Sequence, residues 1–146
     1  MTIPRFYVPG PWTSDRITFP EKASHHAMRV LRMRNGDEAE VFDGEGRTAR
    51  GRTEFSSEGT VLIAESYPEH GRESPLFITL AQAFVSPDKM EWITEKAVEA
   101  GASRIVFFPA ARSVTKLSGD KLTKRLEKLR ATAVSACSAA GAGFLK

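Results

Sequence analysis

The hydrophobic pattern of the chain changes near residue 75, and this change constrains the fold more than any other feature. Before it, short strand-like runs at residues 6–8, 16–19, 38–42 and 60–64 are separated by turn-forming residues. One helix is predicted among them, at residues 22–33, because its apolar residues recur roughly on one face. Several short strands at close spacing are typical of a small β-barrel.

After residue 75 the pattern is that of an α/β protein. Residues 76–84 are almost continuously apolar, which predicts a strand buried on both faces. Ser86 and Pro87 then predict the start of a helix, Gly101 its end, and residues 104–108 a second buried strand. The result is a β-α-β unit, for which we expect a right-handed crossover.

The end of the chain leaves this second domain incomplete. A helix rich in leucine, lysine and arginine is predicted from Ser118, but after Ala133 the small residues predict neither a strand nor a packed helix. Two parallel strands with two helices leave one sheet face poorly covered. We therefore predict an α+β two-domain protein: a small β-barrel at residues 1–70, a polar linker, and an incomplete α/β domain at 75–146 that needs more chain or a partner.

Composition narrows the function classes. With 41% hydrophobic and 27% charged residues, the chain has an ordinary globular composition. It has no apolar run of about 20 residues for a membrane helix, and we expect no signal peptide at its start. Cys137 is the only cysteine, which excludes a disulfide framework and a cysteine-based zinc site and favours the reducing cytoplasm.

The charge of the chain is unevenly divided. Up to residue 74 there are ten Lys and Arg against twelve Asp and Glu, a charge of −2, and from residue 75 onward eleven against six, a charge of +5. The basic second half favours a polyanionic partner.

Two catalytic interpretations of the first half find little support. His25 and His26 are neighbours on a predicted helix, so their side chains diverge by about 100° and do not readily bind one metal ion. No metal-binding cluster and no Ser-His-Asp triad is expected. Residues 43–46 contain two glycines after a strand, but no helix follows, so they predict a hairpin turn rather than a dinucleotide-binding loop. A nucleotide-binding α/β protein is therefore a weak third interpretation.

A basic surface is the alternative for this segment. Arg29, Arg32 and either His25 or His26 have the spacing that places several cations on one helix face. The planar fork of arginine suits phosphate recognition. The competing interpretation is a solvated helix face balanced by nearby carboxylates, and composition alone slightly favours it. Arg112 follows a predicted buried strand, which is where α/β folds place ligand-binding loops.

Taken together, these motifs resemble one family. In the first half they are Arg5-Phe6-Tyr7-Val8, His25-His26, Arg29-Val30-Leu31-Arg32, Gly36-Asp37 and Phe42-Asp43-Gly44. In the second half they are Leu80-Ala81-Gln82-Ala83, Asp88-Lys89-Met90-Glu91-Trp92-Ile93, Lys96-Ala97, Glu99-Ala100-Gly101, Arg112-Ser113-Val114 and Lys116-Leu117. In order and spacing, residues 3–136 resemble the RsmE family of the SPOUT superfamily, which are S-adenosylmethionine-dependent 16S ribosomal RNA uridine-N3 methyltransferases.

The resemblance implies a PUA-like RNA-binding β-barrel followed by a SPOUT domain. It also implies a cytoplasmic homodimer that acts on 16S rRNA in the small ribosomal subunit and binds S-adenosylmethionine in a C-terminal trefoil knot. We expect the sequence to stop before that knot, so no catalytic or cofactor-binding residue is assigned and the 146 residues are expected to be inactive alone. The alternative is a non-catalytic RNA-binding module. The predicted RNA-binding residues are Arg5, His25, His26, Arg29, Arg32 and Arg112.

Overall fold

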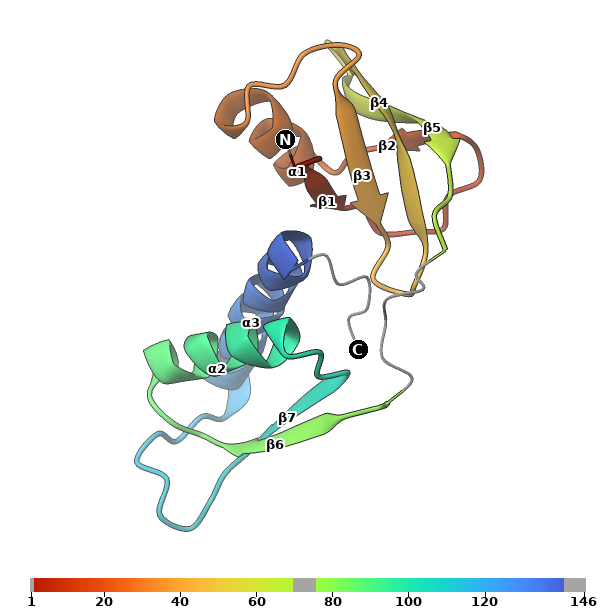
Figure 1. The fold of residues 1–146 in the computed structure, drawn as a ribbon. Helices are drawn as coiled ribbons and strands as arrows, with labels where there is room; N and C mark the ends of the chain where they lie inside the picture. Colours follow the sequence, from red (N-terminus) through yellow and green to blue (C-terminus); the bar gives the residue numbers. More distant parts are fainter. Residues whose placement is uncertain (1, 70–75, 141–146) are drawn as a thin grey trace. The chain divides into compact units, whose positions relative to one another are not determined.

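The chain divides into two compact units, Met1–Gly71 and Arg72–Lys146. The computed structural model describes residues 2–69 and 76–140, and most of the predicted linker lies outside the described residues (Figure 1). Each unit has its own sheet and its own hydrophobic cluster.

Unit 1 contains a five-stranded sheet with the order β1-β3-β4-β5-β2. Strand β1 pairs with β3 in parallel, and the other neighbours are antiparallel. The predicted closed barrel is not observed: among the described residues, pairing ends at β1 on one side and at β2 on the other, and both edge strands have only three residues. The strands are β1 (Arg5–Tyr7), β2 (Arg16–Thr18), β3 (Glu38–Phe42), β4 (Thr48–Ser56) and β5 (Gly59–Ser66).

Strands β4 and β5 form a long hairpin with an irregularity at Gly51. The register shifts between Arg50 and Gly51. A Cβ atom at Gly51 would lie 1.8 Å from the carbonyl oxygen of Ile63 on β5, far inside van der Waals contact. Glycine is therefore required here by the close approach of two backbones.

The predicted helix at residues 22–33 is correct only in its first half. Helix α1 (Glu21–His25) continues as a π-helical turn, η1 (His26–Val30), in which the Leu31 N–H donates to the His26 carbonyl at 3.0 Å. The helical winding ends at Val30, three residues before the predicted end, and Arg32 beyond it has φ +53°.

Two contacts attach this helical segment to the sheet. The hydroxyl oxygens of Ser24 and Thr60 lie 2.6 Å apart, and Ala27 is fully buried. These contacts fix the inner side of the segment, and Ala23 and Met33 also pack against the core, whereas residues 28–32 are exposed.

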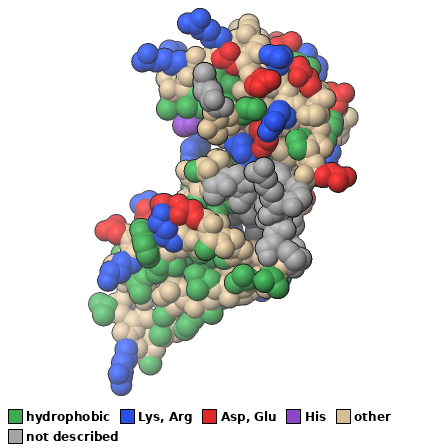
Figure 2. All heavy atoms as spheres, viewed as in Figure 1, with side chains coloured by type: hydrophobic (Ala, Val, Ile, Leu, Met, Phe, Trp, Pro, Cys, Tyr) green, Lys and Arg blue, Asp and Glu red, His purple; other side chains and the backbone are tan. Residues whose placement is uncertain are grey.

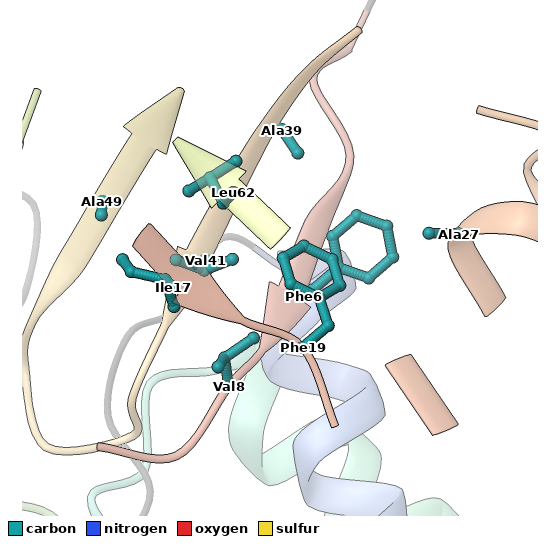
Figure 3. Close-up of a cluster of buried hydrophobic side chains, with 9 residues drawn as sticks. All are labelled: Phe6, Val8, Ile17, Phe19, Ala27, Ala39, Val41, Ala49 and Leu62. Atoms are coloured by element: carbon teal, nitrogen blue, oxygen red, sulfur yellow. The ribbon is translucent and has the colours of Figure 1, made fainter. Parts of the chain in front are cut away.

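The core of unit 1 lies between the sheet and the helical segment. The rings of Phe6 and Phe19 lie 5.1 Å apart between centroids, and Figure 3 shows them side by side with Ala27 facing them. Both aromatic side chains are at most 5% exposed. The buried cluster comprises Phe6, Val8, Ile17, Phe19, Ala27, Ala39, Val41, Ala49 and Leu62.

Unit 2 has the predicted β-α-β order followed by a further helix. Strands β6 (Thr79–Ala83) and β7 (Arg104–Phe108) pair in parallel, and helices α2 (Pro87–Glu99) and α3 (Gly119–Ala140) lie on the same side of them (Figure 1). The predicted burial of residues 76–84 on both faces is wrong. The strand begins only at Thr79, so Leu76, Phe77 and Ile78, which are 65%, 60% and 47% exposed, precede it. Within β6, Thr79 and Ala81 are exposed as well.

Helix α3 is longer than predicted. It continues past Ala133 to Ala140, and Ala133, Ala136 and Cys137 are buried at helical spacing. Alanine is the strongest helix former, so a run of small residues continues the helix and allows close packing. None of the helices in the described residues is long and apolar enough to span a bilayer.

Candidate nucleic-acid interface

The arginines of the unit 1 sheet are paired with carboxylates of neighbouring strands. Glu40 of β3 lies opposite Arg5 on β1 and Arg50 on β4, and its carboxylate pairs with both guanidinium groups. On the same sheet, Arg16 pairs with Glu54 at 3.1 Å, and Arg52 pairs with Glu65 at 3.3 Å and Glu38 at 3.8 Å. The cations of the sheet are thus locally neutralised.

Arg5, one of the predicted RNA-binding residues, is held inside unit 1. Its side chain is 9% exposed, its Nε donates to Glu40, and its guanidinium lies 4.8 Å from the centroid of the Phe42 ring. A phosphate group would have to displace Glu40 to reach it. The geometry gives Arg5 a role in holding β1 against β3.

The basic segment, residues 21–34, behaves differently. It carries four cations against the single carboxylate of Glu21, and all four cations are exposed without an ion pair to a described residue. Figure 2 shows Lys and Arg side chains projecting from this part of unit 1. The four cations are Lys22, Arg29, Arg32 and Arg34.

The carboxylates that could have balanced this segment are engaged elsewhere. Glu38 pairs with Arg52, Glu40 pairs with Arg5 and Arg50, and Asp37 accepts the backbone N–H of Arg34 at 2.7 Å. The interpretation of residues 22–33 as a charge-balanced solvated face therefore loses its basis. An uncompensated cation cluster on one side of a small domain is suited to a polyanion.

The two adjacent histidines lie on the basic segment and are both exposed. The His26 ring makes an edge contact with Phe6, with centroids 6.2 Å apart. Among residues 2–69 and 76–140, no group of three or more His, Cys, Asp or Glu side chains could hold a metal ion.

The turn at residues 43–46 confirms the hairpin prediction. The Asp43 carboxylate is buried and accepts the backbone N–H groups of Glu45 and Arg47 at 2.8 and 2.9 Å. The Arg47 guanidinium lies 5.4 Å from the centroid of the Trp12 ring, a cation–π contact. Sequence reasoning missed this pair of an exposed arginine and a half-buried tryptophan, because its two members come together only through the fold.

In unit 2, Arg112 lies in the loop after β7 and is exposed. A small turn positions this loop: the Ser113 N–H donates to the Ala110 carbonyl at 3.0 Å, and the Ala110 N–H donates to the Ser113 hydroxyl at 3.2 Å. Because Arg112 lies in unit 2 and the basic segment in unit 1, the predicted RNA-binding residues are divided between the two units.

Helices α2 and α3 are joined by an ion-pair cluster. Glu91 accepts from Lys128 at 2.7 Å and from Arg125 at 3.1 Å. The hydrogen bond from Lys128, followed by the charges of Lys128 and Arg125, holds the pKa of Glu91 below its ordinary value. Lys96 pairs with Glu95 and Glu99 on the surface of α2.

The carboxyl ends of β6 and β7 are the edge of unit 2 where a ligand of a parallel sheet binds. Among the described residues at this edge, Ser86 and Arg112 are exposed and Ser113 is half-buried.

Both units match known domain families. Residues 72–145 match the RNA methyltransferase domain family, and residues 19–64 match the RNA methyltransferase PUA domain family. The ribosomal RNA small subunit methyltransferase E of Bacillus subtilis is 35% identical over 106 residues, which cover 71% of this chain and 41% of the relative.

Two solved structures are similar over nearly the whole chain. A methyltransferase from Legionella pneumophila in complex with the cofactor S-adenosylmethionine has a TM-score of 0.90 and 26% identity. The ribosomal RNA small subunit methyltransferase E of Neisseria gonorrhoeae, bound to S-adenosylmethionine, has a TM-score of 0.87 and 28% identity. Each match covers 99% of this chain and 61% or 60% of the solved chain. The chain therefore belongs to the RsmE family of rRNA methyltransferases, with a PUA domain followed by part of a methyltransferase domain.

Proposed function

We propose that the protein containing these residues methylates N3 of a uridine in 16S ribosomal RNA, with unit 1 docking the RNA. The observation that carries the docking role is the basic segment, whose four cations have no carboxylate partner among the described residues. Its predicted contacts are Arg29, Arg32, His25 and His26, joined from unit 2 by Arg112. Family membership supports the reaction class.

The chemistry requires both proton removal and positioning. The N3 of uridine carries a proton, which must be removed, or its anion stabilised, before N3 can accept a methyl group. S-adenosylmethionine supplies the methyl group when bound. Phosphate contacts orient an RNA on a protein without reading its sequence, and orientation of the two reactants contributes much of the rate. The basic segment would provide that orientation.

The finer features of the proposal follow from the family. We propose a cytoplasmic homodimer that acts on the small ribosomal subunit, since the Bacillus subtilis relative is a ribosomal RNA small subunit methyltransferase. The chain spans less than half of that relative and about 60% of the two solved chains. We therefore propose that residues 1–146 alone bind RNA without transferring a methyl group.

The docking role is tested by two double variants with the same change in charge. Arg29→Ala/Arg32→Ala removes two unpaired cations, whereas Arg50→Ala/Arg52→Ala removes two exposed arginines that are paired on the sheet. RNA affinity is measured at several salt concentrations. The first variant should weaken binding and lower the slope of log affinity against log salt by about 1.5, the contribution of two phosphate contacts.

The control variant should change the slope by much less. Equal effects of the two variants would mean that RNA responds only to overall charge, and the docking role of the basic segment would be wrong.

A non-catalytic RNA-binding module is the second candidate, because the chain spans only part of the length of its relatives. Calorimetric titration of the 146-residue chain with S-adenosylmethionine distinguishes the two. Measurable binding, or methyl transfer to 30S ribosomal subunits, would contradict the proposed inactivity of this chain and favour the enzyme.

A further inference from the structure

The basic segment also exposes large apolar side chains. Met28, Val30 and Leu31 are 37%, 60% and 44% exposed; Met28 directly precedes Arg29, and Val30 and Leu31 lie between Arg29 and Arg32 in the sequence. Single exposed apolar residues are ordinary on protein surfaces. Three of them interleaved with unpaired arginines form a mixed surface, which we call the apolar-basic turn (residues 28–32).

The backbone holds these side chains outward. Beyond the π-helical hydrogen bond from Leu31 to His26, the Met33 N–H donates to the Ala27 carbonyl at 3.0 Å across a wider, six-residue span. Ala27 is fully buried, so residues 28–32 wind around the outer side of the segment. π-helical turns and left-handed non-glycine residues are unfavourable, and they occur preferentially at functional sites. Arg32 has φ +53°.

From this surface we infer that the RNA bound by unit 1 offers unpaired bases to Met28, Val30 and Leu31 while its phosphates contact the arginines. The inference rests on the proposed docking function. An A-form duplex presents phosphates and 2′-hydroxyls and keeps its base faces stacked inside, so the three apolar side chains would stay in water. Unpaired bases expose flat apolar faces, and apolar side chains are known to insert against such faces. The cations select a polyanion, and the apolar side chains select its unpaired part.

The test compares two RNAs with the same number of phosphates, one unstructured and one a blunt duplex, by fluorescence anisotropy at fixed salt. The full chain should bind the unstructured RNA more tightly. Val30→Ser/Leu31→Ser should weaken that binding by about fivefold, since it removes about 1 kcal/mol of apolar burial, and should leave duplex binding within about twofold. Val114→Ser is the matched control, because Val114 is 98% exposed in unit 2.

The possible outcomes separate this inference from the docking function. Wild-type protein that binds neither RNA overturns both, and equal binding of the two RNAs overturns only the preference for unpaired bases. The preference for unpaired bases is also overturned if the double variant loses affinity for both RNAs equally, or for neither. If the variant unfolds, as judged by its urea midpoint, Val30→Ser alone is measured by the same criterion. Self-association of the wild type that the variant abolishes would identify a second copy as the partner and overturn the inference.

Discussion

Glu40 links three strands through its two arginine partners, so its charge is expected to matter for the stability of unit 1. Glu40→Gln keeps the shape and one acceptor but removes the negative charge that Glu40 places beside the Arg5 and Arg50 guanidinium groups. The side chains of Arg5 and Glu40 are 9% and 12% exposed. Breaking a fully buried ion pair costs about 3–5 kcal/mol, and the retained acceptor reduces this, so we expect a loss of about 2 kcal/mol in the free energy of unfolding.

The control is a pair of the same residue types on the same sheet. Arg16 and Glu54 are 63% and 55% exposed, and Glu54→Gln should cost about 0.5 kcal/mol or less. For a unit of this size, the Glu40→Gln loss corresponds to a fall in Tm of roughly 10 °C.

Tryptophan fluorescence during urea unfolding measures this loss in unit 1. Trp12 packs against the core of unit 1 and donates to the Val8 carbonyl at 3.1 Å. Trp92 is 61% exposed in unit 2, so a Trp92→Phe background leaves Trp12 as the only tryptophan. Equal shifts of the unfolding midpoint in Glu40→Gln and Glu54→Gln would refute the reasoning, because burial would then not set the strength of the pair.

Three further predictions test other features. Gly51→Ala should destabilise unit 1 by about 3 kcal/mol or more, since its methyl group meets the backbone of Ile63; an unchanged urea midpoint would contradict this. Arg32→Gly should bind RNA more weakly yet unfold at the same or higher urea concentration, because glycine relieves the left-handed conformation; a lower midpoint would argue against strain at this position. Because the folded-state pKa of Glu91 is depressed, its contribution to unit 2 is present above the ordinary value of 4.5 and lost as pH falls through the lower folded value. Glu91→Gln should therefore reduce the loss of stability on acidification, measured by Trp92 fluorescence in a Trp12→Phe background, and an unaltered pH dependence would refute this.

Local sequence signals predicted the bounds of those strands and helices that are determined by neighbouring residues in the sequence. Strands β3 and β7 begin and end at the predicted residues, and Pro87 begins α2 as its fixed φ dictates. The end of α3 was wrong because small residues were interpreted as loss of pattern, although alanine both favours a helix and permits close packing. The π-helical turn was not predicted either; it lies where the segment is held to the rest of unit 1 by the Ser24–Thr60 hydrogen bond and the buried Ala27.

The candidate site was only partly accessible to sequence reasoning. Spacing along a helix grouped Arg29 and Arg32 on one helix face; both are exposed, but Arg32 lies beyond the end of the helical winding at Val30. Spacing could not distinguish them from Arg5, because the partner of Arg5 lies 35 residues away and is brought opposite by strand register. Arg34 was not predicted as a member of the exposed basic segment. The Asp37 carboxylate that accepts its backbone N–H is a local turn signal, but such a signal does not indicate where the Arg34 side chain lies.

The π-helical turn makes the docking surface sensitive to chain length as well as to composition. It contains one residue more per hydrogen-bonded ring than an α-helix. Deleting a single residue between His26 and Val30 would restore regular winding, and each residue turns an α-helix by about 100°. Arg32 and Arg34, which follow the turn, would then each be shifted by one residue along the winding and would point in a different direction, although the chain would keep both of them. In an alignment of relatives, a one-residue gap at this turn would therefore mark a changed RNA preference, even where the surrounding residues are identical.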